Sequence, residues 1–100
     1  MSKPFYEAYA NHAFRFYVRH PVLNSGSVSK PSLEMWKTCE TAMNELSDVE
    51  RAVVVEIFRS RCTMEDAVKC ISREIGMSEN RAWQVLHRVT RRFAELRGLV

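Results

Sequence analysis

The sequence predicts an all-α protein of about five helices, and three observations support this fold class. Only three Gly and three Pro occur in 100 residues, so few positions interrupt a regular backbone. Apolar residues make up 46% of the chain, and they recur at the three- and four-residue intervals of amphipathic helices. Ser or Thr precedes several of these segments, where a hydroxyl group can cap the first turn. This length suits one small domain with a single core and argues against an additional catalytic domain.

The first predicted helix covers residues 5–20 and has an aromatic face. That face comprises Phe5, Tyr9, His12, Ala13 and Phe16, widened by Tyr6 and Tyr17 on one flank. Phe14 and Val18 fall on the opposite side of the helical wheel. A monomer packed through the aromatic face would expose these two side chains, and pairing of two copies is a common way to bury such a patch. We therefore expect a homodimer with Phe14 and Val18 in its interface, unless the 21–31 loop or the C-terminal residues cover them.

A loop over residues 21–31 separates this helix from a second one. The loop holds two Pro, one Gly and several Ser, which are turn formers. The second helix is predicted over residues 32–46, with Ser32 as its N-cap. Residues 1–46 would thus form an N-terminal helical pair for packing and dimerisation, next to a second helical unit over residues 47–100. Both parts are expected to form one compact domain.

Capping motifs mark the beginnings of the third and fourth helices. Ser47 and Glu50 have the spacing of a capping box, in which each side chain bonds the other residue's backbone N–H. Thr63 and Asp66 repeat the pattern with a shorter acid. The inward stripes of these two helices are predicted to be Val49, Val53, Val54, Ile57 and Phe58, then Met64, Ala67, Val68, Ile71 and Ile75.

The segment 71–86 meets the requirements of a helix-turn-helix. Such a motif needs a small residue where the helices touch, a Gly with positive φ in the turn, and apolar anchors on the second helix. Ser72 is the small residue and Gly76 forms the turn, while Ser78 caps a last helix that ends near Gly98. The anchors are predicted to be Ile71, Ile75, Met77, Ala82, Val85 and Leu86. A plain helical hairpin is the alternative.

This half of the chain resembles region four of principal-type bacterial sigma factors, over roughly residues 46–97. The resemblance rests on Leu46-Ser47-x-x-Glu50-Arg51-x-Val53-Val54, Ile75-Gly76-Met77-Ser78-x-x-Arg81-Ala82-x-Gln84-Val85 and Arg88-x-x-Arg91-Arg92-Phe93. It implies that the 78–97 helix lies in the major groove of promoter-type double-stranded DNA. Glu79 and Trp83 depart from the family pattern, so the sequence recognised is not expected to be the usual promoter element. We expect Trp83 to pack as core or, as the alternative, to meet a partner.

Two further segments resemble small proteins encoded by phages and conjugative elements of Gram-positive bacteria. They are Phe14-Arg15-Phe16-Tyr17-Val18-Arg19-His20-Pro21 and Trp36-x-x-Cys39. The other conserved regions of a complete sigma factor have no counterpart in the sequence. The chain is therefore interpreted as a small regulator from a mobile element and not as a sigma factor.

The outward face of the last helix carries the candidate DNA contacts. Residues 81–97 contain five Arg and one Glu, although the net charge of the chain is only +3. Amides near a helix N-terminus suit adenine edges, a carboxylate can accept from cytosine, and Arg suits phosphate. We therefore predict base contacts from Glu79, Asn80 and Gln84. We predict phosphate contacts from Arg81, Arg88, Arg91 and Arg92.

One helix-turn-helix contacts only a short stretch of DNA. Two copies on two half-sites would make more contacts, which independently favours a homodimer. The competing hypothesis is a protein-interaction module that binds RNA polymerase or a sigma partner without reading DNA.

No catalytic, metal-binding or cofactor-binding pattern is present among the three His and three Cys, so we expect no enzyme activity, metal or cofactor. Without a predicted leader or membrane span, the expected location is the cytoplasm, with no membrane partner.

Overall fold

The structure is a computed structural model that describes residues 4–20 and 29–100. Its helices are α1 (Glu7–Arg19), α2 (Lys30–Asn44), α3 (Asp48–Arg59), α4 (Met64–Ile75) and α5 (Glu79–Leu96). These two described ranges contain no strand. The predicted all-α class with about five helices is therefore confirmed. Most of the predicted 21–31 loop, residues 21–28, lies outside the described residues.

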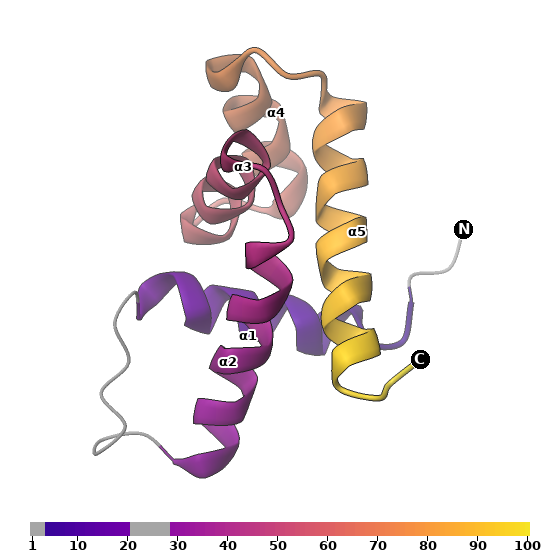
Figure 1. Ribbon diagram of the computed structural model, residues 1–100. Helices are drawn as coiled ribbons and strands as arrows, with labels where there is room; N and C mark the ends of the chain where they lie inside the picture. Colours follow the sequence, from indigo (N-terminus) through magenta and orange to yellow (C-terminus); the bar gives the residue numbers. More distant parts are fainter. Residues whose placement is uncertain (1–3, 21–28) are drawn as a thin grey trace.

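The longest helix, α5, forms one side of the molecule and contacts the other four. Figure 1 shows α3 and α4 beside its first half, with α2 and the crossing α1 beside its second half. One hydrophobic core draws side chains from all five helices. At its centre the ring of Phe14 lies 5.4 Å from that of Phe58 and 5.6 Å from that of Phe93. Three helices are thus joined through three aromatic rings.

The predicted caps are present at the beginnings of α3, α4 and α5. The Ser47 hydroxyl accepts from the Glu50 backbone N–H at 3.2 Å, and the Ser47 N–H donates to the Glu50 carboxylate at 3.0 Å. Thr63 accepts from the Asp66 N–H at 3.2 Å, but the predicted return bond from the Thr63 N–H to the Asp66 carboxylate is absent among the described residues. Ser78 caps α5 by accepting from the Arg81 N–H. These bonds use N–H groups that have no partner within the helix. The beginnings of these helices are therefore encoded locally.

The second helix begins earlier than predicted, at Lys30. Its N-cap is Ser29, whose hydroxyl accepts from the backbone N–H of Ser32 at 3.4 Å. Pro31 lies in the first turn, where the N–H that it lacks would have no helical partner and where its fixed φ suits the helix. Pro31 therefore belongs to α2, and Ser32 is not the cap.

The predicted faces of α1 are only partly right, because the side opposite the aromatic face is buried together with Tyr6 and Ala13. Phe14 is fully buried and Val18 is 7% exposed, whereas Phe5 is 77% exposed. The buried stripe also contains Ala10 and Ala13. These small side chains allow α1 to approach its neighbours closely, and Phe14 then fills the space between α3 and α5. The prediction that Phe14 and Val18 form an exposed dimer patch is therefore wrong.

Two residues of the other predicted inward stripes are exposed, Val49 at 55% and Ile75 at 37%, and so is Leu96 of α5 at 39%. Each lies in the first or last turn of its helix, where the stripe extends past the neighbouring helices. Ile75 is thus not an anchor of the helix-turn-helix, although Ile71 packs against the core as predicted.

Polar and aromatic contacts hold α1 against α2. The Tyr17 hydroxyl donates to the Glu40 carboxylate at 2.6 Å, and the Trp36 indole N–H donates to the His20 carbonyl at 2.7 Å. Burial and the bond to Glu40 raise the pKa of Tyr17, so this phenol stays a donor.

None of the described helices combines the length and the apolar character needed to cross a bilayer.

Candidate nucleic-acid interface

The connection between α4 and α5 is a tight turn built on Gly76. Gly76 adopts φ 82° and ψ 30°, a left-handed conformation that costs other residues about 1–2 kcal/mol. The N–H groups of Gly76 and Met77 both donate to the Ser72 carbonyl, at 2.9 and 2.8 Å. Ser72 itself is 2% exposed, as expected for the small residue at the helix contact. The predicted positive φ of Gly76 is confirmed, and Ser72 is buried next to the turn.

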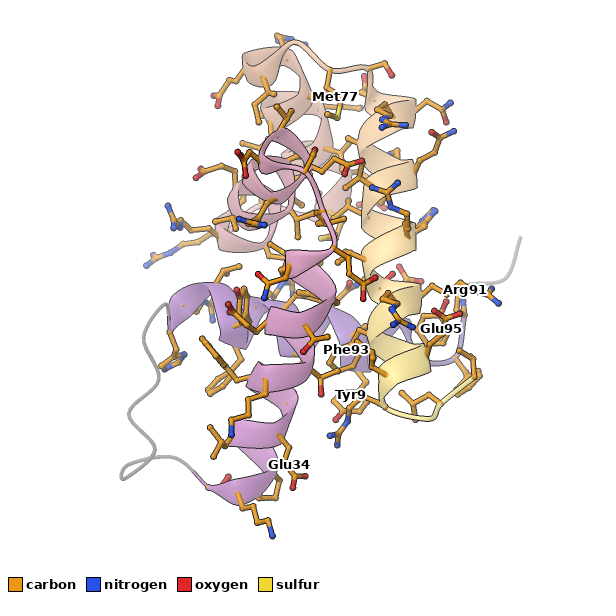
Figure 2. The ribbon with its side chains drawn as sticks, in the orientation of Figure 1. Tyr9, Glu34, Met77, Arg91, Phe93 and Glu95 are labelled. Atoms are coloured by element: carbon orange, nitrogen blue, oxygen red, sulfur yellow. The ribbon has the colours of Figure 1, made fainter. Side chains whose placement is uncertain are left out.

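The inner face of α5 fixes this helix on the core. Ala82, Val85 and Leu86 are all buried, and Met77 packs against the core below the turn. Figure 2 shows Met77 at the end of the molecule where α4 meets α5. The exposed residues of α5 include Glu79, Asn80, Arg81, Gln84, His87, Arg88 and Arg91. The packing of the apolar inner face of α5 against the core thus leaves its polar face exposed to solvent.

The three predicted base-contacting residues lie in the first two turns of α5. Glu79, Asn80 and Gln84 are exposed. Within residues 4–20 and 29–100, their side chains form no hydrogen bond or ion pair. Their amide and carboxylate groups are therefore available to a ligand without loss of an internal bond.

Glu50 binds two of the four predicted phosphate-contacting arginines. Its carboxylate accepts from Arg81 at 3.3 Å and forms an ion pair with Arg88. The Glu50 side chain is only 12% exposed and also receives the Ser47 N–H of the capping box. The bond from Ser47, followed by the bond from Arg88, lowers the pKa of this carboxyl. Glu50 thus joins the beginning of α3 to the middle of α5.

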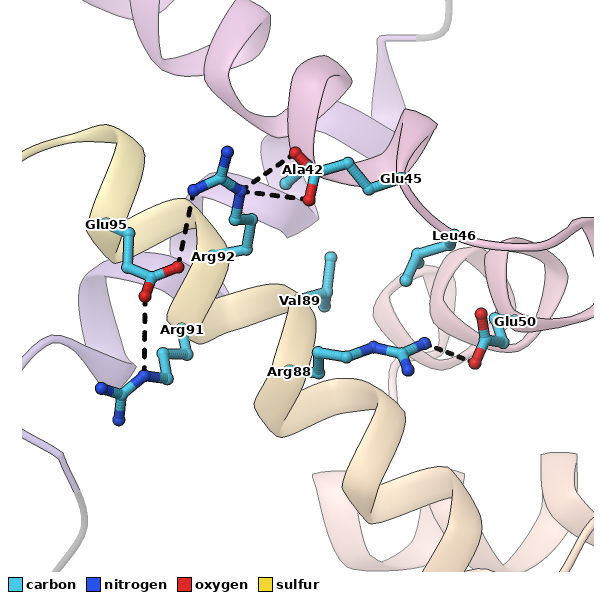
Figure 3. A pocket seen from close by; sticks show the side chains of 9 residues that line it. All are labelled: Ala42, Glu45, Leu46, Glu50, Arg88, Val89, Arg91, Arg92 and Glu95. Atoms are coloured by element: carbon cyan, nitrogen blue, oxygen red, sulfur yellow. Dashed lines mark hydrogen bonds and ion pairs between the residues drawn. The ribbon is translucent and has the colours of Figure 1, made fainter.

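The other two arginines border an open groove between the end of α2 and α5. Arg92 donates to Glu45 at 2.9 Å, and Glu95 lies 3.6 Å from Arg92 and 3.8 Å from Arg91 (Figure 3). The floor of the groove consists of Ala42, Leu46 and Val89. The pairs with Glu45 and Glu95 raise the pKa of Arg92. All four arginines are therefore at least partly neutralised within the chain, and the partner of Arg91 lies on its own helix.

Sequence reasoning missed these carboxylate partners for two different reasons. Glu95 lies four residues after Arg91 and three after Arg92, a spacing that predicts helical ion pairs. Glu45 and Glu50 come from other helices, so only the tertiary arrangement brings them to α5.

Trp83 stands between the inner and outer faces of α5. It is half-buried and packs against the core. Its ring lies 5.8 Å from that of His87, one turn further along the helix. Core packing, the expected role of Trp83, therefore involves only part of its indole ring.

The remaining titratable side chains form no metal-type cluster. Groups of three or more His, Cys, Asp or Glu in ligand arrangement are absent from the described ranges. Cys39 is buried, whereas Cys62 and Cys70 are exposed, and all three are free thiols. Burial raises the pKa of the Cys39 thiol, which makes it unreactive.

Comparisons of the chain with protein-family models, with curated protein sequences and with solved structures found no match.

The low pKa of Glu50 predicts a pH-dependent contribution to stability. A carboxyl whose pKa is lowered in the folded state stabilises the fold above its unfolded pKa of about 4.3, and this contribution is lost as pH falls through the folded pKa. Glu50→Gln keeps a side chain suited to the capping box but removes the charge. We expect the free energy of unfolding at pH 7 to fall by roughly 0.5–1 kcal/mol.

Urea unfolding at pH 7 and at pH 3 tests this expectation. The difference between the wild type and Glu50→Gln should shrink at the lower pH, where Glu50 is increasingly protonated. Glu34→Gln is the matched control, because Glu34 is exposed on α2 and its carboxylate has no ion-pair partner among the described residues. A difference that stays constant with pH would contradict the role of the Glu50 charge.

Proposed function

We propose that this protein is a DNA-binding transcription regulator that inserts α5 into the major groove. The observation that carries the proposal is the α4–α5 unit: a Gly76 turn, a buried Ser72 contact and unpaired Asn80 and Gln84 on the first exposed turns of α5. In helix-turn-helix proteins these turns of the second helix contact base edges. The resemblance of residues 46–97 to sigma region four supports the same role.

The chemistry of the exposed face suits base recognition. The side-chain amides of Asn80 and Gln84 can each donate to and accept from an adenine edge, and Glu79 can accept from a cytosine amino group. These groups lie at the end of the molecule farthest from α2, where α5 begins (Figure 1). The protein can therefore present them to a groove without moving its N-terminal helices.

The predicted phosphate contacts differ in the carboxylate partner that each arginine would have to release. Arg81, Arg88 and Arg92 would exchange a carboxylate on another helix for a phosphate, whereas Arg91 would release only Glu95 on α5. In Figure 2, Arg91 and Glu95 lie together on the outer side of α5. Arg91 is therefore the phosphate contact that this proposal supports best.

Selection of bound duplexes from a random DNA pool tests the proposal directly. We expect a shared sequence motif among the bound duplexes. We also expect affinity to fall linearly with the logarithm of salt concentration. Arg91→Gln should reduce that slope by about 0.9 on every sequence, because one fewer counterion is released.

Arg59→Gln is the control for the change in net charge. Arg59 is 61% exposed on α3 and pairs with Glu56, and it lies outside the proposed interface. Failure to enrich any motif, or an equal effect of Arg59→Gln and Arg91→Gln, would count against the proposal.

The alternative is a module that binds RNA polymerase or a sigma partner. The observation that favours it is the pairing of all four α5 arginines with carboxylates, which reduces attraction to phosphate. Exposed apolar side chains at the ends of α1 and α5 point the same way; these are Phe5, Tyr9, Leu96 and Val100. A protein interface built on such residues would depend only weakly on salt, so the salt titration separates the two functions.

A homodimer remains a prediction, supported now by the small footprint of one helix-turn-helix and not by Phe14 and Val18. Two copies would place two α5 helices in half-sites about one helical turn apart. Sedimentation equilibrium with the selected DNA is expected to give two chains of 11.7 kDa per duplex. A complex that contains a single chain at saturation would contradict the dimer.

A further inference from the structure

A second basic surface lies where α1 meets the connection between α3 and α4. An open pocket there is lined by Arg15, Arg19, Ser60, Arg61, Cys62 and Thr63. A neighbouring hollow shares Arg15 and Arg19 and adds His12, Phe16 and His20. Neither lining includes a carboxylate. Three guanidinium groups thus converge on one surface from two separate parts of the chain.

The charge of this surface has no counter-charge within the described part of the molecule. There, Arg15, Arg19 and Arg61 take part in no ion pair and no side-chain hydrogen bond. The carboxylates nearest in sequence to Arg61, those of Glu65 and Asp66, do not line either hollow. The four α5 arginines, by contrast, all have carboxylate partners. An uncompensated cluster of positive charge is therefore found away from α5, and it attracts anions.

We propose that this surface is a second nucleic-acid contact that binds backbone phosphates. The planar guanidinium group presents paired N–H donors that match phosphate oxygens. The two hollows adjoin along Arg15 and Arg19, which lie one turn apart on α1, so they form an extended open surface. Such a surface accepts a chain of phosphates, whereas a single phosphate would be held best in an enclosed pocket. The inference rests on the proposed function in that DNA is the ligand.

Arg19→Gln and Arg61→Gln test the surface, because both side chains are exposed and their loss should leave thermal unfolding unchanged. Fluorescence anisotropy with a labelled duplex would be measured over a range of salt concentrations. Each variant is expected to lower the salt slope by about 0.9 and to weaken binding about eightfold at 0.1 M salt. The loss should be the same on a selected site and on random DNA. Arg59→Gln, which removes the same charge outside the surface, should have a smaller effect.

The outcomes separate this inference from the proposed function. If both variants behave like Arg59→Gln, the second contact is overturned, whatever α5 does. If they weaken binding while Gln84→Ala has no effect on any sequence, the second contact stands and base reading by α5 fails.

If the protein binds no duplex DNA, it would be titrated with inorganic phosphate and, separately, with a polyglutamate peptide. NMR signals of the side-chain N–H groups of Arg15, Arg19 and Arg61 would be followed. Shifts with inorganic phosphate alone would overturn the nucleic-acid ligand in favour of a free phosphate. Shifts with the peptide would overturn it in favour of an acidic protein partner, and the absence of any shift would remove the site.

Discussion

Phe14→Ala is expected to lower the free energy of unfolding by about 3–5 kcal/mol. The Phe14 ring is fully buried, and it lies within 5.6 Å of the Phe58 and Phe93 rings. These rings come from three helices, so the cavity left by the substitution cannot close by a shift of one element. A small domain has about 5–15 kcal/mol of stability in total, and urea unfolding should therefore show a much lower midpoint.

Phe5→Ala is the matched control for this measurement. Phe5 is on the same segment but is 77% exposed, and its loss should change stability by no more than about 0.5 kcal/mol. Equal effects of the two substitutions would contradict the orientation of α1. An effect of Phe14→Ala that disappears at low protein concentration would instead place Phe14 between two copies.

Gln84→Ala is expected to weaken binding to the selected DNA site by about 1–3 kcal/mol and to leave binding to random DNA nearly unchanged. The amide lies in the second turn of α5, exposed and without a hydrogen-bond partner among the described residues. Its removal would thus cost base contacts and no folding energy. Anisotropy titrations on the two kinds of duplex at one salt concentration measure the difference.

Asn44→Ala provides the control for the loss of an exposed amide. Asn44 is exposed at the end of α2 and not on α5, and its substitution should alter neither affinity. A loss of affinity with Gln84→Ala that is equal on the selected and random duplexes would assign Gln84 to the backbone and not to a base.

Helices and their boundaries could be predicted where the signal is local. The caps at Ser47, Thr63 and Ser78 and the turn at Gly76 depend on residues within three or four positions, so the sequence specifies them without reference to the fold. Pro31 shows the limit of such reasoning, because the same residue can close a loop or begin a helix. Which of the two occurs depends on Ser29, the cap two residues before it.

The orientation of α1 could not be predicted from its own pattern. Both sides of this helix carry apolar residues at helical spacing, and the aromatic side is the larger. The choice is made by the space between α3 and α5, which admits Phe14 when Ala10 and Ala13 allow a close approach. Tyr9 and His12 have polar groups and remain in contact with water at little cost.

The candidate interface could likewise be predicted from the sequence only in part. The exposure of Asn80 and Gln84 follows from the period of α5 alone. The partners of Arg88 and Arg92 do not, because Glu50 and Glu45 precede these arginines by 38 and 47 positions. A stripe of arginines in a sequence therefore overestimates the charge that a folded surface presents.

The packing of Phe14 against Phe58 and Phe93 also determines how the protein can be divided. A fragment that begins at residue 47 would retain the part that resembles region four, but it would expose two large rings that α1 now covers. Such a fragment should aggregate and not fold, even though its motif is complete. The α4–α5 unit of this protein is therefore not an exchangeable module, and transfer of its DNA preference to another protein would require grafting individual α5 side chains.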